Sequence, residues 1–175
     1  MLKERERQGA KTYGSSQKDS LANHICLATQ IAYIIAHLEG ANVSKCLEMA
    51  IFHDNSEIRV GDHDRIGKSY IKGLREAEID ALSDQTAVLG QEMSKRIVSL
   101  YKEKEEGITL EAKVVQDADF IEAALQAKRD FEKGHKDGKR WIERISEAVK
   151  TDSGKMITKA ILNEEDFTGL WLKNR

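Results

Sequence analysis

A histidine and an aspartate, His53 and Asp54, stand side by side where an apolar stretch ends, and Glu57 follows four residues after the histidine. Residues four apart share one face of a helix, so a helix here would present His53 and Glu57 together. Both ionisable groups fall where a core-facing stripe predicts apolar side chains, and a buried carboxylate is costly unless it is paired or bound to a cation. An imidazole beside a carboxylate suits a divalent metal. The alternative is a helix end with polar caps, and the histidine and aspartate alone do not decide between that and a metal site.

Two other predicted helices each carry one ionisable group that could join this pair. His24 begins an otherwise apolar row, where the alternative is a core histidine bonded to a backbone carbonyl. Asp119 lies in an unusually polar row with Glu122, where the alternative is a solvent face. Asp117 lies about 200° around the helix from Asp119, so only one of the two aspartates can point at a given site. Two imidazoles and two carboxylates would hold one divalent metal, with Mn, Co, Fe, Ni or Zn favoured over Mg.

Helices must position these groups, because helical periodicity recurs along the chain while strand signals are poor and proline is absent. The sequence predicts an all-α fold and a single domain over 1–175, with a core of about 19–133 and C-terminal helices of about 137–173 that pack on it or on a partner. The segment 61–68 reads as a loop, and 102–106 as a solvated helix end. The predicted helices cover about 20–39, 45–58, 72–104 with a break near Gly90, 109–133, 139–150, 155–162 and 164–173.

Composition excludes several classes of protein. The net charge of -2 predicts no broad attraction to nucleic acid. No apolar run approaches the roughly 20 residues of a membrane span, and the N-terminus lacks the apolar core of a signal peptide, so we expect a cytoplasmic protein without a membrane partner. Cys26 and Cys46 lie in apolar helical patterns and are expected to be buried free thiols.

Several motifs together resemble the HD-domain metal-dependent phosphohydrolases, and among them the branch that contains the 5'-deoxyribonucleotidases. The resemblance covers most of residues 7–133. It is carried by Asp-Ser-Leu-Ala-Asn-His at 19–24, Phe-His-Asp-Asn-Ser-Glu at 52–57, Gly-Asp at 61–62, and Asp-Ala-Asp-Phe-Ile-Glu at 117–122 running into Leu-Gln-Ala at 125–127.

The resemblance implies an HD-domain helical bundle and an enzyme that hydrolyses (deoxy)nucleoside 5'-monophosphates to nucleoside and phosphate. It implies that one divalent metal is bound by four residues, namely His24, His53, Asp54 and Asp119. Asp119 is favoured over Asp117 by its distance from the Leu-Gln-Ala that follows. The resemblance further implies that Glu57 and Asp62 activate or position the attacking water and that Arg7 contacts the phosphate.

Some alternatives stay open. Lys68 is a candidate phosphate contact, with a solvated loop cation as its alternative, and His63 and Asp64 are weaker candidate ligands. Ala10 stands where the resemblance leads us to expect an aromatic residue, and no proline follows Gly61-Asp62, which leaves base and sugar preference open.

Two other functions compete with monophosphate hydrolysis. One is hydrolysis of a nucleoside triphosphate or signalling nucleotide, although further basic residues to hold a polyphosphate are not obvious. The other is a nucleotide- or metal-binding module without turnover. Trp141 and Trp171 are expected in the core or in a homodimer interface rather than as substrate platforms.

Overall fold

The computed structural model describes residues 1–15 and 19–169, and throughout these residues the regular structure is helical, without a named strand. The predicted all-α fold is therefore confirmed. The elements in chain order are the 3-10 helix η1 (Gly9–Tyr13), α1 (Leu21–Glu39), α2 (Val43–Phe52), α3 (Glu57–Val60), α4 (Arg65–Tyr70), α5 (Leu74–Thr86), the 3-10 helix η2 (Ala87–Leu89), α6 (Gln91–Glu106), α7 (Leu110–Glu132), α8 (Asp137–Ala148) and α9 (Asp152–Asn163).

Side-chain caps begin the central helices within two residues of the starts that the sequence predicts. Ser20 accepts a hydrogen bond from the backbone N–H of Asn23, and Asn42 and Thr109 cap α2 and α7 in the same way. Helix α1 ends at Gly40, whose φ of 67° is left-handed and favours glycine. The predicted limits of α1 and α7 are thus confirmed within a residue or two.

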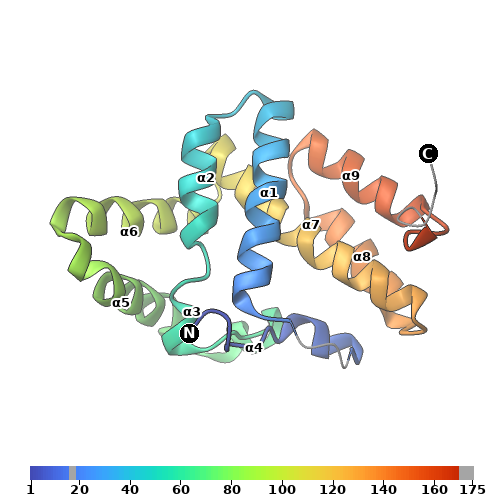
Figure 1. Ribbon diagram of the computed structural model, residues 1–175, viewed down its shortest axis with the longest axis horizontal. Coiled ribbons are helices and arrows are strands. Elements are labelled where there is room, and N and C mark those ends of the chain that lie inside the picture. The colour runs from blue at the N-terminus through green and yellow to red at the C-terminus, as the bar shows by residue number, and fades with distance from the viewer. Residues whose placement is uncertain (16–18, 170–175) are drawn as a thin grey trace.

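Helices α1, α2 and α7 form the centre of the molecule (Figure 1), with α5 and α6 projecting to one side and α8 and α9 packing on the other. The main core lies among the central helices and α8, and a smaller cluster of Leu82, Ile97 and Tyr101 joins α5 to α6. This arrangement leaves the N-terminal segment and α3–α4 together at one end of the central helices.

Helix α1 is long and apolar enough to cross a membrane by length and composition alone, which the sequence analysis did not anticipate. Its buried residues, among them Ala28, Ala32 and Ile35, pack mainly against α2 and α7. This central packing accounts for the apolar residues on one face of α1, because an inner helix of a bundle buries that face. Large apolar side chains elsewhere on α1 are exposed, namely Leu27, Tyr33, Ile34 and Leu38.

Helices α8 and α9 both pack against α7, and they also contact each other. The predicted helix over 164–173 extends beyond the described residues, and its described part, 164–169, is mainly irregular with a turn at 167–168. Both cysteines are free as expected, but Cys26 is exposed and only Cys46 is buried. Cys26 directly follows the buried residue Ile25, and the apolar pattern does not show which of the two neighbours faces the core.

Candidate functional site

Four side chains from distant parts of the sequence converge at one end of the central helices. The atoms His24 Nε2 from α1 and Asp119 Oδ1 from α7 lie 3.2 Å apart, and His53 Nε2 lies 3.2 Å from His24 Nε2. Asp54 Oδ2 lies 3.3 Å from His24 Nε2 and 3.4 Å from His53 Nε2. The predicted ligand set is therefore brought together, with one atom each of His24, His53 and Asp119 within 4.8 Å of one another and Asp54 Oδ2 beside both imidazoles.

The backbone that carries His53 and Asp54 differs from the prediction. Helix α2 ends at Phe52, and residues 53–56 form a tight turn before the short α3, so the predicted helix through residue 58 is wrong. Hydrogen bonds between residues three apart, such as Glu57 N–H to Asp54 C=O at 3.1 Å, close this turn. Neighbouring side chains diverge by about 100° on an α-helix, so the turn helps His53 and Asp54 to reach the same point.

The outer nitrogen of each imidazole is already bonded. Nδ1 of His53 lies 2.7 Å from the carbonyl oxygen of Ala50, which can only accept, so Nδ1 carries the proton. Nδ1 of His24 donates to Glu122 Oε2 at 2.5 Å. Such partners orient an imidazole and leave Nε2 as its ligand atom, the arrangement that surrounds histidine–metal sites.

Asp117 and Asp119 have separate roles in the structure. Asp117 is fully buried and accepts hydrogen bonds from the backbone N–H groups of Lys150 and Thr151 and from the Thr151 hydroxyl, at 2.7–3.0 Å. It thereby fixes the entry to α9. Of the two aspartates, the structure brings only Asp119 to the histidines.

Substituting the two aspartates should separate stability from metal binding. Asp117→Ala removes a charged acceptor shared by several buried donors, and we expect a loss of about 3 kcal/mol in the free energy of unfolding. Asp119→Ala should change stability far less but abolish tight binding of one divalent metal. Urea unfolding and metal titration of both variants test this. A loss of metal binding in Asp117→Ala but not in Asp119→Ala would show that Asp117 is the ligand and Asp119 the structural residue.

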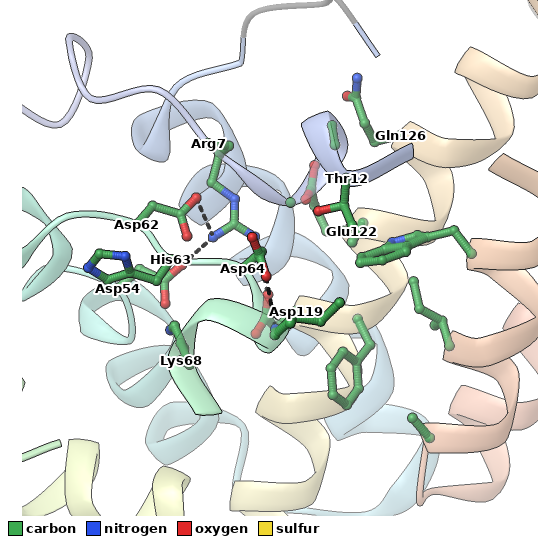
Figure 2. A pocket seen from close by; sticks show the side chains of 18 of the residues that line it. Arg7, Thr12, Asp54, Asp62, His63, Asp64, Lys68, Asp119, Glu122 and Gln126 are labelled. Carbon is green, nitrogen blue, oxygen red and sulfur yellow. Dashed lines mark hydrogen bonds and ion pairs between the residues drawn. The ribbon is translucent and has the colours of Figure 1, made fainter. Parts of the chain in front are cut away.

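Arg7 lies among Asp54, Asp62 and Asp119 (Figure 2). Its Nη1 atom donates to Asp54 Oδ2 at 2.9 Å and lies 3.8 Å from Asp62 Oδ2, and its Nη2 atom lies 3.8 Å from Asp119 Oδ1. Burial alone would lower the pKa of Arg7, but the surrounding carboxylates, Asp54 first, raise it above its ordinary value. Arg7 is therefore a fixed positive charge at the mouth of an acidic cluster.

The carboxyl group of Glu57 is buried beside this cluster. Its Oε1 atom accepts a hydrogen bond from Lys68 Nζ at 3.0 Å, whereas its Oε2 atom is buried without a hydrogen-bond partner. Burial raises the pKa of Glu57 to about 8, and the charge of Asp54 adds to that rise while Lys68 opposes it. Glu57 can therefore hold or release a proton near neutral pH.

Asp62 contacts the N-terminal segment, whereas His63 and Asp64 make local contacts. Asp62 Oδ2 accepts from the backbone N–H of Gln8 at 2.7 Å and so anchors the segment that carries Arg7. The predicted loop over 61–68 is partly wrong, because Asp64 caps the short helix α4 by accepting from Ile66 and Gly67 N–H. His63 Nε2 lies 3.1 Å from the carbonyl oxygen of Val60. His63 and Asp64 face the cavity but do not join the four converging groups.

A cavity of about 960 Å³ opens from this cluster and runs along α7 toward α8. Its lining includes Arg7, Asp54, Glu57, Asp62, Lys68 and Asp119, together with Lys104 and Trp141, which the sequence analysis did not assign to a site. Lys104 is buried, so the prediction that 102–106 is a solvated helix end is wrong there. The sequence did contain an indication of this burial, since Lys104 extends the buried row of Ile97 and Tyr101 by one helical turn.

The converging atoms fit a divalent metal by their chemistry. His24, His53 and Asp119 each offer a ligand atom within 4.8 Å of the others. Asp54 supplies a fourth at similar spacing. The Oε2 atom of Glu57 lies 3.9 Å from Arg7 Nη1 but has no hydrogen-bond partner, so it has room to accept from a further polar group at this centre.

Comparison with known proteins places these motifs among characterised relatives. Residues 1–161 match a family model described as HD domain. The chain is 32% identical over 136 residues to the 5'-deoxynucleotidase HDDC2 of Dictyostelium discoideum, covering 72% of this chain and 70% of that protein. It is 31% identical over 129 residues to the 5'-deoxynucleotidase HDDC2 of Danio rerio, covering 72% of this chain and 62% of the relative's length. A crystal structure of a Pyrococcus horikoshii protein matches with a TM-score of 0.75 at 25% identity, covering 92% of both chains.

Proposed function

The chain belongs to the HD domain family, and from this premise we propose that it is a metal-dependent phosphohydrolase that cleaves (deoxy)nucleoside 5'-monophosphates to nucleoside and phosphate. The printed names of its relatives support the substrate class. The observation that carries the proposal is the convergence of two imidazoles and two carboxylates beside Arg7, next to the buried carboxyl group of Glu57, one oxygen of which has no hydrogen-bond partner.

His24, His53, Asp54 and Asp119 would hold one divalent cation. Mixed nitrogen and oxygen ligands favour Mn, Co, Fe, Ni or Zn over Mg, which prefers oxygen ligands throughout. When bound, such a cation supplies Lewis acidity to a phosphoryl oxygen and to the attacking water.

The residues around this centre divide the remaining tasks. Arg7 has a planar guanidinium group that can bind two phosphoryl oxygens at once, and Asp62 fixes the backbone next to it. Glu57 Oε2, which has no hydrogen-bond partner and lies 3.9 Å from Arg7 Nη1, takes the proton of the water whose oxygen attacks phosphorus. The bond from phosphorus to the 5'-oxygen breaks, and that oxygen takes up a proton from solvent to become the hydroxyl of the nucleoside. Lys68 holds the other oxygen of Glu57 and keeps the carboxylate aimed at the centre.

Phosphate release from a panel of nucleoside mono-, di- and triphosphates tests the proposal, using metal-stripped protein refilled with Mn, Co, Zn or Mg. We expect metal-dependent release from monophosphates. Release from no compound, with one metal bound per chain, would instead favour a binding module.

Hydrolysis of a polyphosphate is a second candidate, favoured by cations that line the cavity beyond Arg7 and Lys68. These are Lys104, Arg144 and Lys150. Two of them already have partners, because Lys104 Nζ lies 3.0 Å from Glu105 Oε1 and Lys150 Nζ donates to Gln116 Oε1 at 2.7 Å. We therefore rank this candidate second, and the same panel separates it by preferential release from triphosphates.

Glu122 should control metal affinity without being a ligand. Glu122→Gln keeps the size of the side chain but weakens the charged acceptor at His24 Nδ1, and we expect metal affinity to fall by about 10- to 100-fold. Competition with a fluorescent chelator measures the change, and Glu111→Gln on the first turn of the same helix is a matched control. An unchanged affinity would remove Glu122 from the metal-binding role.

A further inference from the structure

We propose that the indole ring of Trp141 is the stacking platform for the nucleobase of the bound nucleotide, an inference that rests on the proposed function. Trp141 projects from α8, an element that supplies none of the four converging groups. It is half-buried, packs partly against the main core, and lines the same cavity as Arg7 and Asp119.

The cavity has the length and direction that a nucleotide needs. It follows α7 from Asp119 through Ala123 to Gln126, which is seven residues and about 10 Å along the helix. Figure 2 shows Gln126 well away from Asp119, on the far side of Glu122. When a phosphate is held at Arg7 and Asp119, the part of the cavity toward Gln126 therefore remains available for the sugar and base.

Trp141 lies at this far end because its ring packs against Tyr13. The two ring centroids are 5.7 Å apart, and the Tyr13 hydroxyl donates to Asp130 Oδ2 at 3.0 Å. Gln126 donates to the same Asp130 oxygen at 3.3 Å. The Tyr13–Asp130 hydrogen bond thus places Tyr13, and with it the indole of Trp141, beside the Gln126 end of the cavity.

The two sides of the cavity differ in chemistry. The η1 side offers Gly9, Ala10 and Thr12, which cannot stack on a base, and Tyr13, whose ring is buried against Trp141. The α7 and α8 side offers Phe120, Trp141 and Ile145. Trp141 has the larger aromatic face of this group and is backed by a second ring whose hydroxyl is fixed, so it presents a rigid surface with little conformational entropy to lose.

The test compares a substrate with a base and one without. Trp141→Leu keeps an apolar side chain but removes the π-face, whereas Trp141→Phe keeps a smaller face. For 2'-deoxyadenosine 5'-monophosphate we expect kcat/KM to fall roughly 5- to 100-fold in the leucine variant, mainly through KM, and much less in the phenylalanine variant. For deoxyribose 5-phosphate, both variants should match the unsubstituted protein.

Controls distinguish stacking from damage to the fold. Tyr33→Ala removes an exposed aromatic ring on α1 that does not line the cavity, and it should leave both substrates unaffected. Equal losses on both substrates in Trp141→Leu, or no loss on either, would overturn the proposal.

Fluorescence provides a readout that does not need turnover. The chain has two tryptophans, so a Trp171→Phe background reports on Trp141 alone. Quenching by 2'-deoxyadenosine 5'-monophosphate but not by deoxyribose 5-phosphate supports the platform, and equal responses to both contradict it. If neither compound is hydrolysed, the proposed function fails, while this titration still decides whether Trp141 contacts a base.

Discussion

Glu57→Gln is expected to lower kcat for nucleoside monophosphate hydrolysis by about 10²- to 10⁴-fold while one divalent metal remains bound per chain. The substitution keeps the shape of the side chain but removes its ability to take a proton. Glu57 is suited to that task because its Oε2 atom is buried without a hydrogen-bond partner and its pKa is raised to about 8 by burial. Phosphate release measured alongside metal content tests both halves of the prediction.

The control for this variant is Glu48→Gln, an exposed glutamate whose contact is a surface ion pair with Arg96 at 2.9 Å. It should leave kcat and metal content unchanged. Turnover that survives Glu57→Gln would show that another group accepts the proton. Loss of the metal together with turnover would show instead that Glu57 belongs to the ligand set. Retained substrate binding without any turnover in the unsubstituted protein would favour the binding module.

The second large effect is expected at Arg7. Arg7→Met should lower kcat/KM for monophosphates by about 10²- to 10³-fold, because a charge-assisted, two-pronged contact with the phosphate is lost in a buried site. Arg7→Lys keeps the charge without the planar fork and should recover only part of the loss. Metal affinity should not fall in either variant, since Arg7 now occupies an oxygen of Asp54 that a metal would use.

A matched arginine provides the comparison. Arg59 makes an exposed ion pair with Asp84 at 3.1 Å, and Arg59→Met should leave steady-state kinetics unchanged. An Arg7→Met enzyme with unaltered KM and kcat would exclude Arg7 from the phosphate site. Its contacts with Asp54 and Asp62 would then be purely structural.

Helix positions were largely predictable because their signals are local. Ser20, Asn42 and Thr109 cap helices that begin within two residues of the predicted starts, and α1 ends at Gly40 as its predicted range implies. The turn after Phe52 was not predictable from periodicity, because the four-residue spacing of His53 and Glu57 also fits a continuing helix. The convergence of His24 with the residues of α7 depends on packing between elements almost a hundred residues apart.

Side chains that face a polar cavity were the hardest to identify. Lys104 continues a buried row, yet its charge and acidic neighbours are typical of a solvated helix end, and only the cavity explains its burial. Trp141 was expected in a core or an interface, and the structure places its ring against the core and along the cavity at once. Periodicity shows that a residue faces inward, but it cannot distinguish a packed interior from a binding cavity.

The most direct test of the central claim follows metal binding and turnover in a single titration. Metal-stripped protein is titrated with Mn²⁺ or Co²⁺ while phosphate release from a deoxynucleoside 5'-monophosphate is recorded, with Asp54→Ala beside it. Activity should begin near zero, rise in proportion to added metal and level off at one equivalent, and the variant should remain inactive. Full activity without metal, or equal activity in Asp54→Ala, would contradict a metal-dependent hydrolase centred on His24, His53, Asp54 and Asp119.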